Sequence, residues 1–206
     1  MSKRRNPADS EQRLYQVASA QGGFFTAGQA RASGYTNSKQ HYHVGVGNWI
    51  REGRGIYRLA LHPEPDRPDL ILWCLWSRDR SGTPKGVFGH QTALSLFDLT
   101  DLSPSKLDMI VPKGFRRSAP LPTVLRLHYD EVPAVDVATI HDVPVTRPLR
   151  SLLDLIRTGE IPVATLKQGY REAMRRGMIT PSELSRARRN PETTQALQQL
   201  RRRKAA

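Results

Sequence analysis

Residues 22–60 read GGFFTAGQARASGYTNSKQHYHVGVGNWIREGRGIYRLA, and this stretch decides the fold of the N-terminal part of the chain. Thr26 and Gln29 stand three residues apart, which is the spacing of a capping box, where each side chain accepts a hydrogen bond from the other residue's backbone N–H. They predict a short helix over residues 26–33. Gly34 follows, and a glycine just past a helix supplies the left-handed backbone conformation that ends it.

A second helix is expected directly after this turn, because Thr36, Asn37 and Ser38 all offer side-chain oxygens that can cap it. We expect it to run from Asn37 to about Val46, with a C-terminal end weakened by glycine at position 45. Two short helices joined by a glycine-containing turn form the helix-turn-helix pattern.

A basic hairpin is expected after the second helix. Residues 49–51 and 56–59 are β-prone runs, and the sequence Glu-Gly-Arg-Gly between them predicts a tight turn. A hairpin in this place is a wing. We therefore expect residues 1–60 to form a winged helix-turn-helix DNA-binding domain.

The net charge of +13 is concentrated at the two ends of the chain. Residues 1–60 hold nine Lys and Arg against three Asp and Glu, residues 61–170 hold thirteen of each, and residues 171–206 hold ten against three. Because the excess coincides with the predicted helix-turn-helix and with the C-terminal end, it indicates polyanion binding at those places.

The rest of the chain is expected to form a second domain. Residues 61–69 contain three prolines and several charges, which suits a semi-rigid linker between a domain over 1–60 and one over 70–206. A chain of 206 residues is long enough for each of two domains to bury a core.

The second domain is predicted to be mixed α/β, so the whole chain is of the α+β class and ends in a basic helical segment. Thr146 is expected to cap a helix whose apolar stripe ends at Gly159, and the last helix is expected to be loosely held because it offers few apolar contacts. Helices are predicted over residues 69–80, 91–99, 146–159, 163–176, 181–189 and 193–204, and strands over 107–111 and 124–129, with short edge strands over 134–140 and 143–145.

Cysteine usage and hydropathy bear on the cellular compartment. Cys74 is the single cysteine, which excludes an intramolecular disulfide and a cysteine-based zinc site. No apolar run approaches the length of a membrane span, and no apolar segment follows the N-terminal charges as in a secretory signal. We expect a cytoplasmic protein.

Blocks of sequence in both halves carry a family resemblance. The N-terminal blocks are GGFFT (22–26), GYT (34–36), YHV (42–44), GNW (47–49) and RGIYRLA (54–60), and the later ones are VFGHQTAL (87–94), LDMIVP (107–112) and VPVTRPLRSLLDL (143–155). The first set resembles the winged-helix domain of AbiEi-type antitoxins. The second set is similar to the C-terminal domain of that family in the same order, so the resemblance covers most of residues 11–160.

The resemblance implies a transcriptional regulator of a toxin-antitoxin system. Such a protein is encoded beside a nucleotidyltransferase-like toxin and represses its own operon by binding inverted repeats in double-stranded DNA, which suggests a homodimer on the operator. The C-terminal domain is needed to counter the toxin, and the two proteins do not need a stable complex. No cofactor is implied.

The outward face of the second helix supplies the first candidate DNA contacts. With positions 40, 43 and 44 facing the core, the exposed residues are Asn37, Ser38, Lys39, His41 and Tyr42. Recognition helices read base edges with residues near their N-termini. Asn pairs with adenine and Lys with guanine acceptors, while Ser38 and the preceding Thr36 suit phosphates; phosphate contact or plain solvation is the alternative for each. Gln40 is unusual, because an apolar residue normally faces the core there.

The wing supplies the second set. Arg51, Arg54 and Arg58 are expected to contact phosphates or to enter a minor groove, whose negative potential attracts arginine. The alternative is that they solvate the edge of the hairpin and protect it from aggregation.

A DNA-targeted nuclease or repair-associated enzyme is the rival hypothesis, since a mixed α/β domain attached to a DNA-binding module often cuts DNA. No glutamate is followed two positions later by lysine, and the acidic residues near predicted strands (Asp108, Asp130, Glu131 and Asp136) lack a lysine at the spacing of such magnesium sites. His41 and His43 are expected to diverge on a helix and to form no metal site with His90, for which we expect a helix-capping or structural hydrogen-bond role. Neither catalytic residues nor a metal site is predicted.

The basic C-terminal segment, residues 171–206, has three possible roles. Its arginines could contact flanking DNA, dock an acidic toxin or RNA, or solvate a helical bundle. The sequence does not decide between them.

Overall fold

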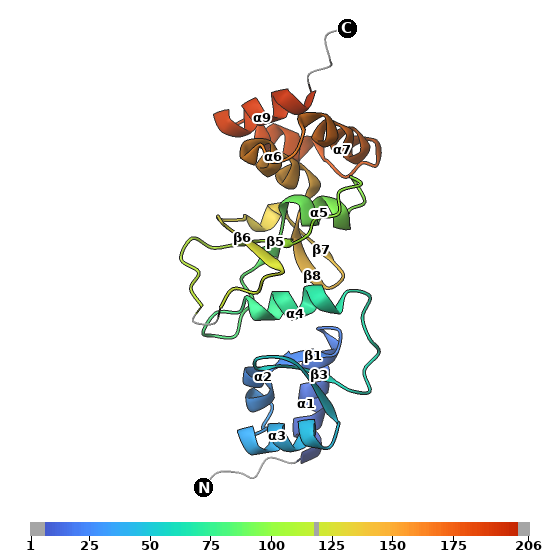
Figure 1. Cartoon of the computed structure of the whole chain (residues 1–206), viewed down its shortest axis with the longest axis vertical. Helices are drawn as coiled ribbons and strands as arrows, with labels where there is room; N and C mark the ends of the chain where they lie inside the picture. Colours follow the sequence, from blue (N-terminus) through green and yellow to red (C-terminus); the bar gives the residue numbers. More distant parts are fainter. Residues whose placement is uncertain (1–6, 118–119, 202–206) are drawn as a thin grey trace. The chain divides into compact units, whose positions relative to one another are not determined.

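A computed structural model of the chain describes residues 7–117 and 120–201. Contacts within the chain divide it into two compact units. Unit 1 extends to Gly86 and includes His141–Val143, and unit 2 contains Val87–Ile140 and the rest of the chain from Pro144. Both units contain helices and strands, which confirms the α+β class (Figure 1).

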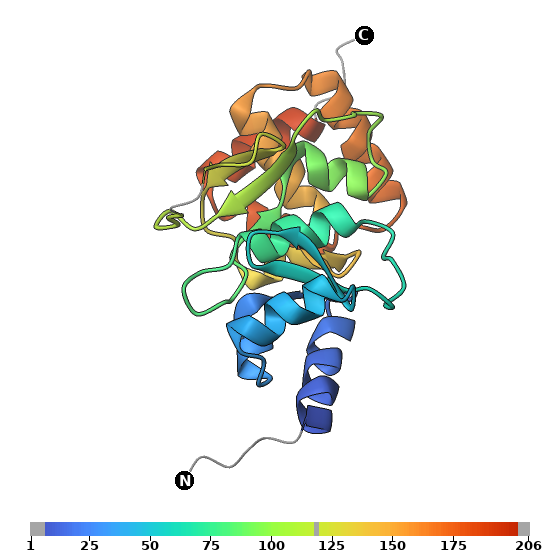
Figure 2. The same ribbon diagram turned by 60° about the horizontal axis from the view of Figure 1, so that its bottom comes forward.

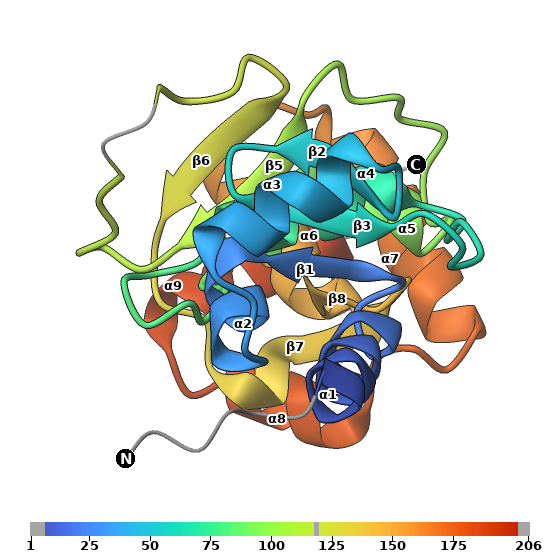
Figure 3. The same ribbon diagram turned by 90° about the horizontal axis from the view of Figure 1, so that it is seen from below.

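Unit 1 has the element order predicted for a winged helix-turn-helix. Its strands form an antiparallel sheet of order β1-β3-β2, which Figure 3 shows beside α2 and α3. The two predicted helices and the hairpin are confirmed, whereas the first helix and the first strand were not predicted. The elements are α1 (Pro7–Ser19), β1 (Phe24–Thr26), α2 (Ala27–Ala32), α3 (Asn37–Gly45), β2 (Trp49–Gly53), β3 (Ile56–Leu59) and α4 (Pro68–Trp76).

Local hydrogen bonds set the ends of α2 and α3 as the sequence predicts. Thr26 Oγ1 accepts from Gln29 N at 3.2 Å, and Gln29 Oε1 accepts from Thr26 N at 2.8 Å, which completes the capping box. Gly34 has a φ of 106°, a backbone conformation in which any residue with a side chain would be strained. Thr36 Oγ1 then accepts from Lys39 N and caps α3.

The core of unit 1 explains why α1 and β1 belong to it. Leu14 and Ala18 of α1 are buried against Phe25 of β1 and Trp49 of β2. Phe25 and Trp49 meet edge to face, with ring centroids 4.8 Å apart. Because β1 has only three residues and gains its partners through β3, its own sequence carries little strand signal.

The boundary between the units lies later than the predicted linker. Helix α4 was assigned to the second domain, but its Leu70 and Ile71 are buried and it packs against β1 and β3 of unit 1. Segment 61–69 therefore runs within unit 1 rather than between domains. The physical reason is the apolar face of α4, which covers the sheet that a three-stranded wing domain leaves open.

Unit 2 is built on a five-stranded mixed sheet of order β6-β5-β4-β8-β7. β5 pairs parallel with β6 and antiparallel with β4, and β4 pairs parallel with β8. The predicted strands over 107–111 and 124–129 are confirmed. Two details differ: β4 was not predicted, and β8 lies inside the sheet rather than at its edge. The strands are β4 (Val87–Phe88), β5 (Leu107–Val111), β6 (Leu125–Tyr129), β7 (Val137–Ile140) and β8 (Val143–Thr146), with a 3₁₀ turn over Ala134–Asp136.

Five helices complete the described part of unit 2 (Figure 2). Their core joins leucines of α6 to residues of α5, α7 and α9. Arg147, not Thr146, occupies the N-cap of α6, because Thr146 is still in β8 and bonds through Oγ1 to Ser151 Oγ. The helices are α5 (His90–Leu96), α6 (Pro148–Thr158), α7 (Val163–Arg175), α8 (Pro181–Ala187) and α9 (Pro191–Arg201).

The last helix is not loosely held. Ala196, Leu197 and Leu200 of α9 are each at most 3% exposed and belong to the core of unit 2. The expectation of loose packing was wrong, because it counted apolar residues rather than the single face on which they lie. Among residues 7–117 and 120–201, no helix combines the length and the apolar character that crossing a membrane requires.

Candidate nucleic-acid interface

Helix α3 presents a continuous polar face to solvent. Asn37, Ser38 and Lys39 in its first turn are exposed, as are His41 and Tyr42 one turn on and the capping Thr36. Tyr42 is 63% exposed, unusually open for an aromatic side chain. Every residue predicted from the sequence to face outward on this helix does so, which keeps all of them available for contact.

Gln40 holds the opposite face of α3 against α2. Its side chain is 3% exposed, and Nε2 donates to the backbone oxygens of Tyr35 at 3.1 Å and of Ala27 at 3.3 Å. A leucine there would fill the space but leave the Tyr35 oxygen without this donor. The polar residue in an apolar position therefore fixes the angle between α2 and α3 by hydrogen bonds.

His43 fixes the C-terminal end of α3 to the wing sheet. Its ring stacks on Trp49, with centroids 4.8 Å apart and planes 15° from parallel, and meets Tyr35 edge on. Its Nδ1 lies 3.2 Å from Asn48 Nδ2. Burial lowers the pKa of His43, which favours the neutral ring needed to accept from the Asn48 amide.

The wing, formed by β2, β3 and the turn between them, offers two arginines to solvent. Arg51 and Arg54 are exposed, and their side chains form no ion pair or hydrogen bond within residues 7–117 and 120–201. Charged groups left without a protein partner are the ones that can neutralise a polyanion.

Arg58 behaves differently from the prediction. Its Nε lies 2.7 Å from Glu52 Oε1, its side chain is 13% exposed, and its guanidinium lies 5.9 Å from the centre of the Phe24 ring. This arginine closes the base of the wing and has little surface left for a phosphate. Arg58 therefore belongs to the internal contacts of unit 1 rather than to the exposed charge of the wing, and the same ion pair neutralises Glu52, the single acidic residue of the wing.

The two histidines of unit 2 stack on each other, and one of them, His90, is buried. His90 is 6% exposed, adopts a left-handed φ of 52° and stacks on His128 with centroids 3.6 Å apart. Burial, with the nearby His128, lowers the pKa of His90 to about 4, so the ring is neutral near pH 7. Gly89, not His90, occupies the N-cap of α5, so the predicted capping role is wrong, and Nδ1 of His90 makes no hydrogen bond in the described part of the chain.

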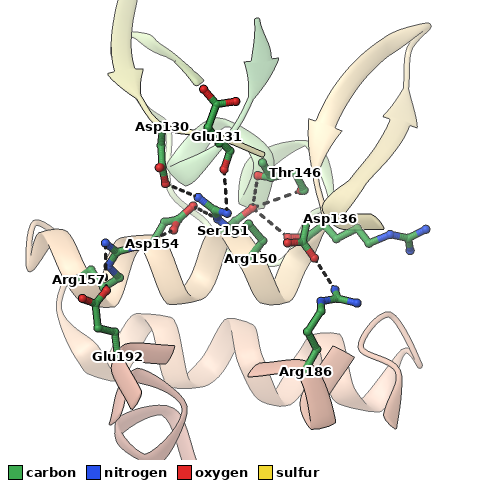
Figure 4. Close-up of polar contacts among 11 residues, drawn as sticks. Asp130, Glu131, Asp136, Thr146, Arg150, Ser151, Asp154, Arg157, Arg186 and Glu192 are labelled. Atoms are coloured by element: carbon green, nitrogen blue, oxygen red, sulfur yellow. Dashed lines mark hydrogen bonds and ion pairs between the residues drawn. The ribbon is translucent and has the colours of Figure 1, made fainter. Parts of the chain in front are cut away.

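Three acidic residues of the nuclease hypothesis, Asp108, Asp130 and Asp136, each have a different partner, and Figure 4 shows the pairs of Asp130 and Asp136. Asp108 Oδ1 lies 2.9 Å from His128 Nε2, Asp130 pairs with Arg150 at 2.7 Å, and Asp136 pairs with Arg186. No group of three or more His, Cys, Asp and Glu side chains suited to a metal ion occurs among the described residues.

Arg150 is the centre of an ion-pair network that the sequence did not reveal. It donates from Nε to Asp154 Oδ2 and from Nη2 to Asp130 Oδ2, both at 2.7 Å, and so ties α6 to the segment after β6 (Figure 4). Burial raises the pKa of Asp154 while the Arg150 guanidinium opposes that rise. The i to i+4 spacing of Arg150 and Asp154 was a signal that could have indicated half of this network.

The basic C-terminal segment divides into paired and unpaired arginines. Arg175 pairs with Glu172, and Arg176 donates to the backbone oxygens of Phe97 and Asp98. Arg171, Arg188 and Arg189 are exposed and make no side-chain ion pair or hydrogen bond within the described chain. Residues 202–204, which carry the end of the basic run, lie outside the described residues.

Comparison with known proteins gives a family match in the N-terminal region and a similar fold over most of the chain. Residues 12–60 match the family model described as "Transcriptional regulator, AbiEi antitoxin". The fold is similar to the crystal structure of the Rv2827c protein from Mycobacterium tuberculosis, with a TM-score of 0.57 and 14% sequence identity over 97% of this chain and 79% of that chain. No curated protein sequence matches the chain. The matched segment contains α2, α3 and the wing, so residues 12–60 of this chain are similar to the family of AbiEi antitoxin transcriptional regulators.

Proposed function

We propose that this protein is a DNA-binding transcriptional repressor of the antitoxin type, which binds double-stranded operator DNA through unit 1. The observation that carries the proposal is that unit 1 exposes both the polar first turn of α3 and the unpaired arginines of the wing. Helix residues of this kind read base edges in a major groove, and arginines of this kind hold backbone phosphates or enter a minor groove.

The roles of the individual residues follow from their chemistry. Asn37 and Lys39 would read bases, because an amide pairs with adenine and an ammonium group with the acceptors of guanine. Thr36 and Ser38 would hold phosphates, with His41 and Tyr42 facing the same groove. Arg51 and Arg54 would contact the backbone from the wing.

Autoregulation of a toxin-antitoxin operon is the biological role that this proposal supports. The protein would act as a homodimer on inverted repeats in the cytoplasm and would counter a nucleotidyltransferase-like toxin without a stable complex. It would do so without catalysis or a cofactor. The support is the similarity of residues 12–60 to the AbiEi antitoxin family of transcriptional regulators.

Hydroxyl-radical footprinting on the chain's own promoter, with and without magnesium, tests the proposal. We expect protection of two half-sites related by symmetry and intact DNA under both conditions. Magnesium-dependent cleavage would favour the DNA-targeted nuclease instead. If the promoter is not protected at any of the salt concentrations at which the protein stays folded, the proposal of a DNA-binding repressor is wrong.

A companion experiment addresses the antitoxin role. Growth arrest by the protein of a neighbouring nucleotidyltransferase-like gene should be relieved when this chain is co-expressed from an unrelated promoter. The two proteins should not co-purify. If the arrest is not relieved, the proposed antitoxin activity is wrong, whereas the proposed transcriptional repression is not contradicted.

A further inference from the structure

A basic groove lies on unit 1 between α2 and the segment that follows α4. It has a volume of about 390 Å³ and is lined on one side by α2, including Arg31, and on the other by residues 78–82, including Arg80. Figure 3 shows this blue-green segment looping beside α2. Neither the helix-turn-helix pattern nor the match over residues 12–60 includes the second wall of the groove.

Two residues that line the groove, Arg78 and Ala27, are hydrogen-bonded to the turn of the wing. Arg78 Nη2 lies 3.3 Å from the backbone oxygen of Arg54 and 3.4 Å from that of Gly55, and its Nη1 donates to Leu75 O at 2.8 Å. Ala27 N, at the start of α2, donates to Gly55 O at 3.0 Å. The wing turn, the start of α2 and the segment after α4 are thus held together at one end of unit 1.

The charges that line the groove are mainly positive and partly uncompensated. Arg31 and Arg80 are exposed, and their side chains form no ion pair or hydrogen bond within the described chain. Asp79, the one acidic lining residue, accepts hydrogen bonds from Ser81 and Thr83 and pairs with Lys85 Nζ at 3.2 Å. The carboxylate of Asp79 is therefore held by residues of its own loop, and the ammonium group of Lys85 offsets its negative charge.

We propose that this groove binds a backbone phosphate of the same DNA duplex that the wing contacts, with Arg31 and Arg80 as the phosphate ligands. Arg78 is a positioning residue, which sets the wing turn against the segment carrying Arg80. The proposal rests on the proposed function and extends its contact surface beyond the helix-turn-helix and the wing. Two unpaired guanidinium groups on opposite walls of a groove suit a tetrahedral oxyanion, because each can donate two parallel hydrogen bonds.

The test compares Arg31→Ala, Arg80→Ala and the double variant with Arg13→Ala. Arg13 lies on α1 outside the groove, and among residues 7–117 and 120–201 its side chain bonds only to the backbone oxygen of Asp9 in its own helix, so it provides the same loss of charge elsewhere on unit 1. Fluorescence anisotropy of the full-length proteins on an own-promoter duplex and on a scrambled duplex gives affinity at several salt concentrations.

Each groove variant should bind both duplexes about fivefold more weakly near physiological salt, with the salt slope lowered by about one and the ratio between duplexes unchanged. Arg13→Ala should stay close to the parent protein. If the groove variants match Arg13→Ala while Arg54→Ala loses affinity, the groove proposal is wrong and the proposed function survives. If the parent protein binds neither duplex, both fail.

We expect the alanine variants to stay folded, so a loss of affinity reports on DNA binding. Within the part of the chain that the structure describes, the side chains of Arg31 and Arg80 form no hydrogen bond whose loss would destabilise unit 1. Should an alanine variant nevertheless unfold, Arg31→Gln and Arg80→Gln keep most of the apolar stem while removing the charge, and the same affinity criterion applies to them.

Discussion

A single buried amide decides how α3 is held in unit 1. Gln40 occupies a position where helix-turn-helix packing calls for an apolar side chain, yet it is 3% exposed and donates to two backbone oxygens. The backbone at the turn between α2 and α3 thus has a partner that an apolar residue could not supply. Position 40 is buried and also has to supply a hydrogen-bond donor, so the stability of unit 1 depends on the chemistry of this side chain more than on its volume.

Gln40→Leu should destabilise unit 1 by about 1–3 kcal/mol, because it leaves the buried oxygen of Tyr35 without its donor. Urea unfolding followed by tryptophan fluorescence measures the change, because all three tryptophans, Trp49, Trp73 and Trp76, lie in unit 1. Gln12→Leu on the exposed side of α1 is the matched control and should shift stability by less than about 0.5 kcal/mol. Equal midpoints for the two variants would show that the hydrogen bonds of Gln40 contribute nothing.

His90 predicts a pH dependence for unit 2. Its pKa is lowered to about 4 by burial and by His128, whereas the unfolded chain has the ordinary histidine value. Between these values the unfolded state binds more protons, so stability is fully present above about pH 6.5 and falls as pH drops toward 4.

The His90 contribution to this loss is up to about 3 kcal/mol by linkage. Asn accepts left-handed backbone better than most residues, so His90→Asn keeps the fold at φ 52° and removes the titrating ring. The difference in unfolding free energy between parent and variant should shrink as pH falls from 7 to 4. A difference that stays constant over this range would contradict the assigned cause.

Elements with their own start and stop signals could be predicted from the sequence. Helices α2 and α3 carry a capping threonine and a terminal glycine, and these act within a few residues. β1 and β4 were missed because strands of three and two residues exist only through their partners in the sheet. The misplaced cap at Thr146 has a related cause, since the side chain suits a cap but the residue is still needed in β8.

Gly45 offers a test of how far α3 is limited by its sequence. It is the last residue of α3, it lacks a positive φ, and a Cβ there would meet nothing within 4 Å. Gly45→Ala should therefore stabilise unit 1 by about 0.5–1 kcal/mol through reduced chain entropy and better helix propensity.

Gly47→Ala is the control for that change. Its neighbourhood is equally open, but its φ of 79° is left-handed, so the substitution should destabilise by about 1 kcal/mol. Thermal unfolding of both variants gives the two signs. A loss of stability in Gly45→Ala would mean that the end of α3 needs a conformation other than the helical one.

In the molecule as a whole, the local sequence pattern located the candidate DNA interface but did not show which other residues and segments belong to it. The sequence predicted which α3 residues face outward, because helical period alone decides that. It could not show that Arg58 pairs with Glu52, or that α4 and the segment after it belong with the wing, since both depend on tertiary contacts. The basic C-terminal segment shows the same limit: its charge was visible, but its division into paired and unpaired arginines was not.

The central claim is that the first turn of α3 reads bases while the wing holds phosphates. Its most direct test is the affinity of Lys39→Ala and Arg54→Ala for an own-promoter duplex and a scrambled duplex over a series of salt concentrations. Lys39→Ala should reduce the preference for the promoter by about 1–3 kcal/mol, the value of a good base contact. Arg54→Ala should weaken both duplexes equally and lower the salt slope by about one. Affinities and slopes for both variants that equal those of Arg13→Ala would contradict the account.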